Sequence, residues 1–216
     1  MGRRSTGLAV PLDPVADLKR RLRAKPGSDT VRAYWSVREW SRRTRLRKVI
    51  DPWWHDHGFD GHPAAVGKRV ALALIAQPRC EPQIAGITIL YELLGDQLRA
   101  SDLPMFARLF TEGHLVDVNL VDWFAIKVLG ALLDREPGRP AVVRAIADWR
   151  TAETTWQRRA ACLAFLNLAA TPSTGLTTTI LSICAAVIWG HERTDQLAAG
   201  RLLATHAKVE PARVEA

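Results

Sequence analysis

Cysteine is scarce in this sequence of 216 residues, which limits how the fold can be held together. The three cysteines are Cys80, Cys162 and Cys184, and none of them stands in a CxxC or other ligand-like spacing. An odd number of cysteines without paired spacing is unlike a secreted disulfide framework. We therefore expect free thiols, a reducing compartment and a cytoplasmic location.

Long hydrophobic runs are also missing. The longest candidate, around TILSICAAVIWG, is shorter than the roughly 20 residues that a helix needs to cross a bilayer. The N-terminal stretch MGRRSTGLAV is charged but has no adequate apolar segment behind it, so we expect no signal peptide. Because apolar residues still make up 48% of the chain, the composition indicates a globular protein without a membrane partner.

The signatures of the common enzyme classes are absent: the chain has no P-loop and no GxGxxG, HExxH or GxSxG motif. Residues 53–62, WWHDHGFDGH, bring three histidines and two aspartates together. Their spacing includes glycines, and no second cluster supplies further ligands, which favours a polar turn with two aromatic anchors over a metal site. We expect neither a metal nor a cofactor.

Positive charge is abundant and unevenly distributed. The net charge is +8, and residues 1–48 contain 14 Lys and Arg against four Asp and Glu. Such a block favours a polyanionic partner, a nucleic acid before a membrane surface, while the alternative is a solvated arm that binds nothing specific. The block residues that we expect to contact a nucleic acid are Arg42, Arg43, Arg45, Arg47 and Lys48.

Strand-like alternation is rare, whereas apolar residues recur at helical spacing along most of the chain. Prolines and capping residues mark many helix starts, and glycines mark the ends. Helices are expected at 14–24, 30–48, 62–77, 82–98, 102–110, 115–134, 140–150, 153–169, 172–189 and 193–208. Their short connections and their grouping in pairs predict an all-α fold, either an α-solenoid of helix pairs or an irregular bundle.

Tryptophan is unusually frequent, with eight residues against two tyrosines. Most of them are expected at helical core positions, which applies to Trp35, Trp40, Trp53, Trp54, Trp149, Trp156 and Trp189. The exception is Trp123, because it adjoins a carboxylate.

That carboxylate is Asp122, in the stretch LVDVNLVDWF of residues 115–124. A carboxylate among apolar side chains is costly unless it is paired or functional. A buried ion pair with an arginine is therefore one reading, and a position facing a ligand cleft is the other. Arg158 and Arg159 begin a later apolar helix with side chains about 100° apart, so one can reach a phosphate while the other stays solvated or pairs with Glu153.

Several segments together resemble the AlkD-type DNA alkylation repair family, which comprises HEAT-like-repeat DNA glycosylases that remove alkylated purines. The segments are LVDWFAIKVLGALL, ADWRTAETTWQRRAACLAFL, DQLAAGRLLATHAK and, earlier, VGKRVALALIAQPRCEPQIAGITILYELL. Their order and spacing carry the resemblance, which covers roughly residues 30–208. It implies HEAT-like repeats that form a right-handed α-solenoid with a concave DNA-binding face. The expected domains are a basic, partly flexible segment at 1–28, the repeats at 29–209 and a tail at 210–216.

The resemblance also assigns roles to single residues. Asp122 falls on the family's catalytic aspartate, and Arg159 matches its phosphate-contacting arginine. Val118, Arg201 and Ala204 stand where the family has a first tryptophan, a second tryptophan and that tryptophan's arginine partner. The loss of the aromatic side chains is consistent with a glycosylase for another, bulkier lesion, and equally with a DNA-binding relative that does no chemistry.

The resulting expectation is a monofunctional glycosylase that hydrolyses the N-glycosidic bond of N3- or N7-alkylated purines for base excision repair. Asp122 would be catalytic, and Arg158, Arg159 and Arg201 would contact DNA together with the basic block. The expected partner is double-stranded DNA carrying alkylated bases, bound by a cytoplasmic monomer that is nucleoid-associated when on DNA. The alternatives are a silent family member that binds damaged or branched DNA, and a helical-repeat scaffold for another protein.

Overall fold

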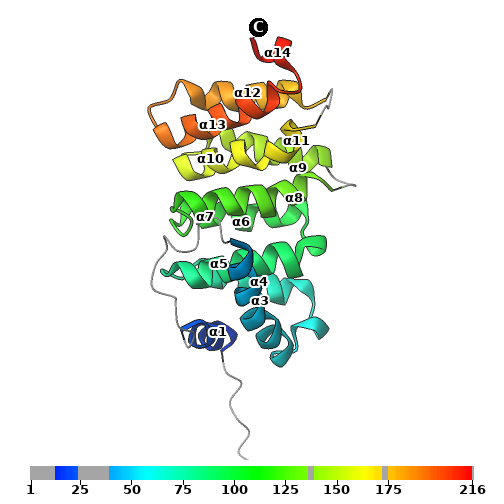
Figure 1. Cartoon of the computed structure of the whole chain (residues 1–216), viewed down its shortest axis with the longest axis vertical. Coiled ribbons are helices and arrows are strands. Elements are labelled where there is room, and N and C mark those ends of the chain that lie inside the picture. Colours follow the sequence, from blue (N-terminus) through cyan, green and yellow to red (C-terminus); the bar gives the residue numbers. More distant parts are fainter. Residues whose placement is uncertain (1–12, 24–38, 136–138, 172–174, 216) are drawn as a thin grey trace, which may run out of the picture. The chain divides into compact units, whose positions relative to one another are not determined.

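The computed structural model describes residues 13–23, 39–135, 139–171 and 175–215, and the chain divides into two compact units. Unit 1 comprises residues 1–61 and unit 2 comprises residues 62–216. Within the described residues the regular structure is entirely helical, so the all-α prediction is confirmed (Figure 1). None of these helices combines the length and the apolar character that a bilayer crossing requires.

Unit 1 contains α1 (Pro14–Arg23), α3 (Glu39–Asp56) and the 3₁₀ turn η1 (Phe59–Gly61). Asp13 caps α1, because its Oδ1 accepts a hydrogen bond of 3.0 Å from the Val15 backbone N–H. The described part of the predicted helix 30–48 runs on to Asp56 in spite of Pro52. Residues 30–38, which include Trp35, lie outside the described residues.

The turn predicted at 53–62 begins only after Asp56, four residues later than expected, because α3 extends to that residue. Trp53 and Trp54 belong to α3 and are buried, and both contact the buried Phe59 with ring centroids 5.2 and 4.7 Å apart. The Trp53 indole N–H donates to the Pro14 carbonyl at 3.1 Å. Burial of these rings keeps the chain helical where glycine and histidine content alone suggests a turn. Among the described residues there is no group of three or more side chains suited to holding a metal ion.

Unit 2 is a succession of helix pairs, in which several helices continue into 3₁₀ or π segments. The first two pairs are α4 (Ala64–Ile75) with α5 (Cys80–Thr88) and its π segment η2 (Ile89–Leu93), and α6 (Leu103–Thr111) with α7 (Val118–Trp123), η5 (Phe124–Leu129) and α8 (Gly130–Leu133). Two 3₁₀ turns, η3 (Gly95–Gln97) and η4 (Ala100–Asp102), lie between these pairs. The later elements are α9 (Arg139–Ala147), η6 (Asp148–Thr151), α10 (Thr155–Ala164), α11 (Leu166–Ala169), α12 (Thr177–Ile188), α13 (Arg193–His206) and α14 (Pro211–Glu215).

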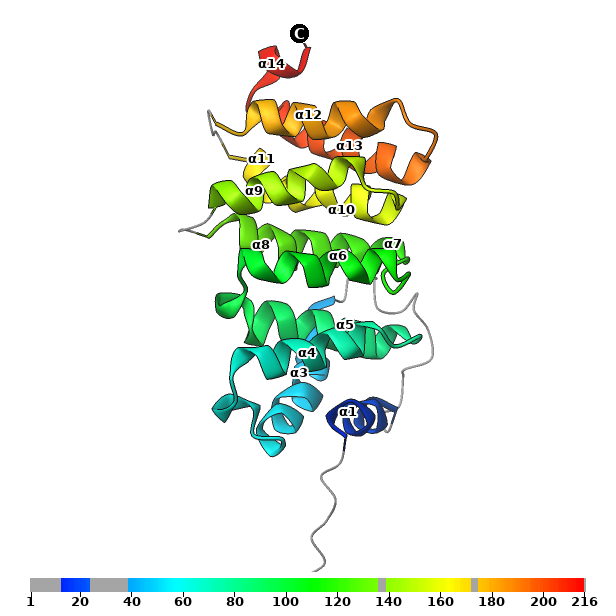
Figure 2. The same cartoon turned by 180° about the vertical axis from the view of Figure 1, so that it is seen from behind.

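The second helices of successive pairs stack on one another within unit 2. Helix α5 packs on α7, α7 packs on α10, and α10 packs on α13. Figure 1 shows these second helices on the near face, and Figure 2 shows α4, α6, α9 and α12 on the opposite face. This is the repeated-pair architecture that the sequence predicts, and it brings residues about 40 positions apart onto neighbouring helices.

The predicted helix 115–134 is divided by a π segment. It begins at Val118, because the Asp117 side chain caps it by accepting hydrogen bonds of 2.9 and 3.1 Å from the Asn119 and Leu120 backbone N–H groups. The π segment η5 then follows directly after Trp123. Single π turns inside helices occur frequently at functional sites, since they re-aim the side chains on either side.

Other boundaries differ from the prediction near the C-terminus. Helix α12 begins at Thr177 and not at residue 172, and residues 172–174 lie outside the described residues. The expected tail contains the short helix α14. Trp189, expected in the core, is 87% exposed, because it follows the last residue of α12 and so lies beyond the packed face of that helix.

Candidate active site

Asp122 lies near the end of α7 and is clasped by an arginine from α10. The Arg159 Nε–H donates to Asp122 Oδ1 at 2.6 Å, and Arg159 Nη2 donates to Oδ2 at 2.9 Å. This two-point contact is the strong, planar form of an arginine–carboxylate pair. The Asp122 side chain nevertheless stays 23% exposed, so the carboxylate is fixed by the protein but not closed off from the outside.

Arg159 is itself fixed. Its side chain is only 8% exposed, and Nη1 donates a hydrogen bond to the Thr194 carbonyl at the start of α13. One guanidinium thus joins α7, α10 and α13. In this geometry Arg159 positions Asp122, and its contact with a phosphate remains a prediction.

Arg201, on α13, completes the group. Its Nη1 lies 3.7 Å from Asp122 Oδ2, which is ion-pair distance but too long for a hydrogen bond. Its side chain is 55% exposed, so it can turn away from Asp122 at little cost. Three residues singled out in the sequence therefore converge on one point of unit 2.

Arg158 points elsewhere. Its Nε–H donates to Asp195 Oδ2 at 2.7 Å, and its Nη1 donates to the Ala152 and Glu153 carbonyls at 2.8 and 2.9 Å. The sequence suggests either a solvated side chain or a pair with the Glu153 carboxylate. The observed partners are instead the buried Asp195 and two backbone oxygens, which tie the start of α13 to the loop before α10. Contact of Arg158 with DNA remains a prediction.

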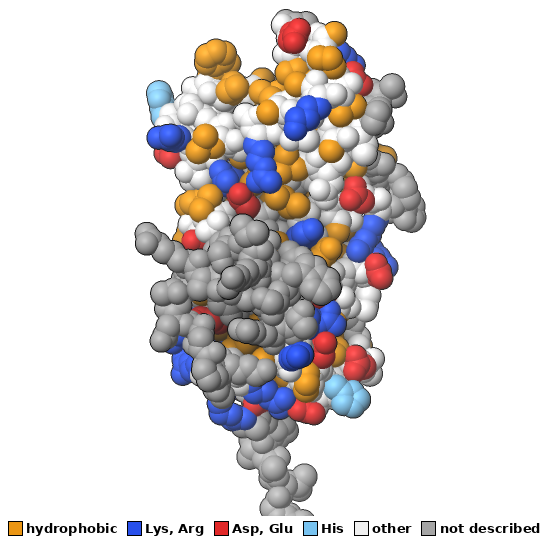
Figure 3. Space-filling view, viewed as in Figure 1, with side chains coloured by type: hydrophobic (Ala, Val, Ile, Leu, Met, Phe, Trp, Pro, Cys, Tyr) orange, Lys and Arg blue, Asp and Glu red, His pale blue; other side chains and the backbone are white. Residues whose placement is uncertain are grey.

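Each of Asp122, Arg159 and Arg201 is preceded, four positions earlier on its own helix, by an uncharged residue. Val118 precedes Asp122 by four positions and is exposed, and Leu197 precedes Arg201 by four positions and is exposed. Thr155 precedes Arg159 in the same way, and its buried hydroxyl has no hydrogen-bond partner among the described residues. Sequence reasoning missed Thr155 and Leu197, although the four-residue spacing on a helix could have found them. Figure 3 shows hydrophobic, basic and acidic side chains intermixed over α10 and α13 on this face.

The cysteines offer no nucleophile. Cys80, Cys162 and Cys184 are free thiols, as predicted. Burial raises the pKa of Cys80 to about 11 and that of Cys184 to about 12, and it raises the pKa of Cys162 still further. These thiols stay protonated at neutral pH and are therefore poor nucleophiles.

The predicted basic block belongs to unit 1, where its residues lie on α3. The side chains of Arg42, Arg43 and Arg45 lie outside the described part of the structure. Arg47 donates from Nε to Asp51 Oδ1 at 2.6 Å, and Lys48 is exposed. DNA contact by this block remains a prediction.

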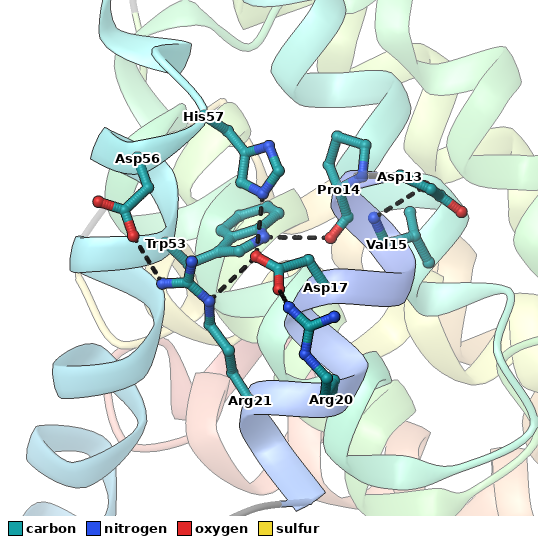
Figure 4. A network of polar contacts seen from close by, with 9 residues as sticks. All are labelled: Asp13, Pro14, Val15, Asp17, Arg20, Arg21, Trp53, Asp56 and His57. Atoms are coloured by element: carbon teal, nitrogen blue, oxygen red, sulfur yellow. Dashed lines mark hydrogen bonds and ion pairs between the residues drawn. The ribbon is translucent and has the colours of Figure 1, made fainter. Parts of the chain in front are cut away.

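Unit 1 contains a polar cluster around Asp17 that the sequence did not predict. The buried Asp17 carboxylate accepts from Arg20 and Arg21 on its own helix, and a ring nitrogen of His57 lies 3.1 Å from its Oδ2 (Figure 4). Burial raises the pKa of Asp17, but the hydrogen bond with His57 and the charges of Arg21 and Arg20 outweigh it, so that this pKa lies below its usual value. Arg21 also pairs with Asp56 at 2.8 Å, so the cluster joins α1 to the end of α3.

The model of a family described as DNA alkylation repair enzyme matches residues 41–216, a span that includes Asp122, Arg159 and Arg201. No curated protein matches the chain.

Proposed function

The chain belongs to the DNA alkylation repair enzyme family, and we propose that it acts as a monofunctional DNA glycosylase. The proposed reaction is hydrolysis of the N-glycosidic bond of N3- or N7-alkylated purines in duplex DNA, at the start of base excision repair. The observation that carries the proposal is the geometry of Asp122, a carboxylate fixed by a buried arginine yet still partly open to the outside.

The proposed reaction needs little assistance from the protein. Alkylation at N3 or N7 gives the purine a positive charge, so the purine leaves as a neutral base when it takes the electron pair of the C1′–N bond. The deoxyribose becomes an oxocarbenium cation, water bonds to C1′, and a proton is released to solvent. A fixed negative charge beside C1′ stabilises that cation, and one such group is worth about 10²–10³ in rate. No cofactor is required in this scheme.

In this proposal the site has a suitable net charge for the reaction only when DNA is bound. Asp122 carries one negative charge, while Arg159 and Arg201 carry two positive charges beside it. In the free protein this group would therefore repel a cation. A DNA phosphate that pairs with the exposed Arg201 offsets the excess, which leaves Asp122 clasped by Arg159 and able to act on the sugar.

The second candidate function is a silent family member that binds damaged or branched DNA. The observation in its favour is the same clasp, because Arg159 neutralises the carboxylate that would have to act. The residues at the family's two tryptophan positions point in the same direction, since Val118 and Arg201 cannot cradle a cationic base through aromatic rings.

A base-release assay separates these functions. Duplexes carrying methylated purines or bulky purine adducts are incubated with the wild type and with Asp122→Asn, and DNA affinity is measured for both proteins. The expected result is a 10²–10³-fold slower chemical step for Asp122→Asn, an effect of roughly the size cited for one electrostatic group, with nearly unchanged affinity. Asp117→Asn is the matched control, because it makes the same chemical change on the same helix and asparagine caps as well as aspartate.

The alternative outcomes are equally distinct. A wild type that binds duplex DNA but releases no base from any alkylated substrate contradicts the glycosylase proposal and supports the silent family member. A wild type without salt-sensitive DNA binding contradicts both and leaves the helical-repeat scaffold, since phosphate contacts impose a steep salt dependence.

A further inference from the structure

Four large hydrophobic side chains are exposed in the described part of the chain: Val116, Val118, Trp189 and Leu197. Val116 precedes α7 and Val118 is its first residue, whereas Trp189 lies in the α12–α13 connection and Leu197 in the second turn of α13. The α6–α7 and α12–α13 connections lie on the same side of unit 2 in both Figure 1 and Figure 2. We name these four residues the apolar rim, and two of them stand one helical turn before Asp122 and Arg201.

The backbone on both sides of Trp189, the most exposed member, is held by hydrogen bonds. The Gly190 backbone N–H donates to the Val187 carbonyl at 3.0 Å, and the Gln196 side-chain amide donates to the Ile188 carbonyl at 3.2 Å and to the Gly190 carbonyl. Gln196 lies on α13 between Asp195, which pairs with Arg158, and Leu197 of the rim. Trp189 thus stands in a turn that is bonded to the first turn of α13. The same end of α13 accepts the hydrogen bond from Arg159 through the Thr194 carbonyl.

Exposure of this kind marks a contact surface. An indole offers one of the largest apolar surfaces of any side chain, and tryptophan is enriched at binding interfaces. The rim is also flanked by positive charge. Arg193, Leu197 and Arg201 follow one face of α13 at four-residue spacing, and both arginines are exposed.

The alternation along α13 fits a DNA strand. Phosphates alternate with the apolar faces of deoxyribose and base along such a strand, as the arginines alternate with Leu197 along the helix. We propose that the apolar rim contacts the DNA strand at the lesion, with Trp189 stacked on a base or sugar exposed beside it. The inference rests on the proposed function for its partner, duplex DNA, but it assigns a binding surface that is separate from Asp122.

Salt dependence distinguishes this contact from a phosphate contact. Affinity for a methylated-purine duplex and for the same undamaged duplex is measured from low to high salt with the wild type, Trp189→Ala and Arg201→Ala. Trp189→Ala should weaken binding roughly tenfold at every salt concentration without changing the slope, because stacking releases no counterions. Arg201→Ala should lower the slope by about one unit, and Arg108→Ala, an exposed arginine on α6, should leave both quantities unchanged.

Fluorescence gives an independent readout. Addition of the methylated-purine duplex should quench tryptophan emission in the wild type and in Trp149→Phe, whose substituted residue is buried, but much less in Trp189→Phe. Trp189→Phe keeps an aromatic ring and should retain more affinity than Trp189→Ala. Melting temperatures of both Trp189 variants should match the wild type, since the side chain lies outside the core.

Affinities of Trp189→Ala equal to those of the wild type, with full quenching in Trp189→Phe, would overturn the assignment of the rim to DNA. Base release by the wild type in that case keeps the glycosylase proposal intact, so the two failures are distinguishable. A changed salt slope for Trp189→Ala would also overturn it, because that result indicates a displaced phosphate contact and not stacking.

Discussion

At the scale of single residues, arginine side chains pair with carboxylates whose burial would otherwise destabilise the fold. Arg159 clasps Asp122, Arg158 holds the buried Asp195, and Arg20 and Arg21 surround Asp17. A buried carboxylate loses hydration, and the two-point contact at Asp122 and the double arginine contact at Asp17 compensate for that loss, whereas Asp195 has one arginine contact. Of these carboxylates, Asp122 combines a fixed position with an opening to solvent, which is why the proposed chemistry is assigned to it.

The Asp17 cluster leads to a prediction about acid stability. The pKa of Asp17 lies below its usual value near 3.8, so the folded protein holds the ionised form more tightly than the unfolded chain does. Its stabilising effect is therefore complete at neutral pH and is lost as the pH falls below about 4. Asp17→Asn should lower the free energy of unfolding of unit 1 by about 2 kcal/mol at pH 7, and the difference should vanish in acid.

Urea titrations at several pH values, followed by tryptophan emission, measure this effect because Trp53 lies beside the cluster. Asp51→Asn is the control: it removes an exposed carboxylate on α3 that pairs with Arg47, and it should change stability little at any pH. A loss of stability in Asp17→Asn that persists unchanged in acid would contradict a role for the ionised carboxylate.

At the scale of helices, close packing between partners decides which positions accept a side chain. Helices α4 and α5 approach so closely at Gly86 that an added Cβ would lie 2.5 Å from the Ala71 carbonyl oxygen and 2.8 Å from Ile75 Cγ1. The backbone of α4 cannot move aside without disturbing the pair. Gly86 therefore serves the contact between the two helices.

Gly86→Ala should destabilise unit 2 by roughly 1–3 kcal/mol, because the cost of overpacking exceeds alanine's higher helix propensity. Gly200→Ala is the matched control on α13, where an added Cβ meets nothing within 4 Å. That substitution should leave stability unchanged or raise it by up to about 1 kcal/mol. Thermal unfolding followed by circular dichroism measures both, and equal melting temperatures for the two variants would argue against the close approach.

At the scale of the whole molecule, charge and proposed chemistry occupy different units. The basic block of α3 belongs to unit 1, while Asp122, Arg159 and Arg201 belong to unit 2. The proposed division of labour is that the block supplies affinity for any duplex and that the Asp122 group supplies the selective step. Affinity and catalysis should then be separable by mutation.

Replacement of Arg42, Arg43, Arg45 and Arg47 with alanine tests that separation. Duplex binding should weaken, and the salt slope should flatten by up to about four units, one for each phosphate that an arginine no longer neutralises. The rate of base release at saturating protein should stay close to that of the wild type. Replacement of Arg144, an exposed arginine on α9, serves as the control, and unchanged binding of the fourfold variant at both low and high salt would contradict a role for the block.

Local pattern in the sequence determined the all-α class, the positions of most helices, the free thiols and the resemblance that singles out Asp122. Helical periodicity and proline positions are properties of a few neighbouring residues, so they can be recognised without knowledge of the fold. The same argument explains the smaller errors, since Trp53 and Trp54 extend α3 through burial that a local pattern does not contain.

Only the tertiary structure decided how the polar residues are paired. Arg159 and Asp122 are 37 positions apart, as are Arg158 and Asp195, and His57 and Asp17 are 40 positions apart. Which side chain turns inward depends on the faces that meet when helices stack, on the π segment after Trp123 and on the cost of leaving a buried carboxylate unpaired. The exposure of Trp189 also appears only in the tertiary structure, since the residue follows the end of α12 at Ile188 and lies outside the packed face of that helix.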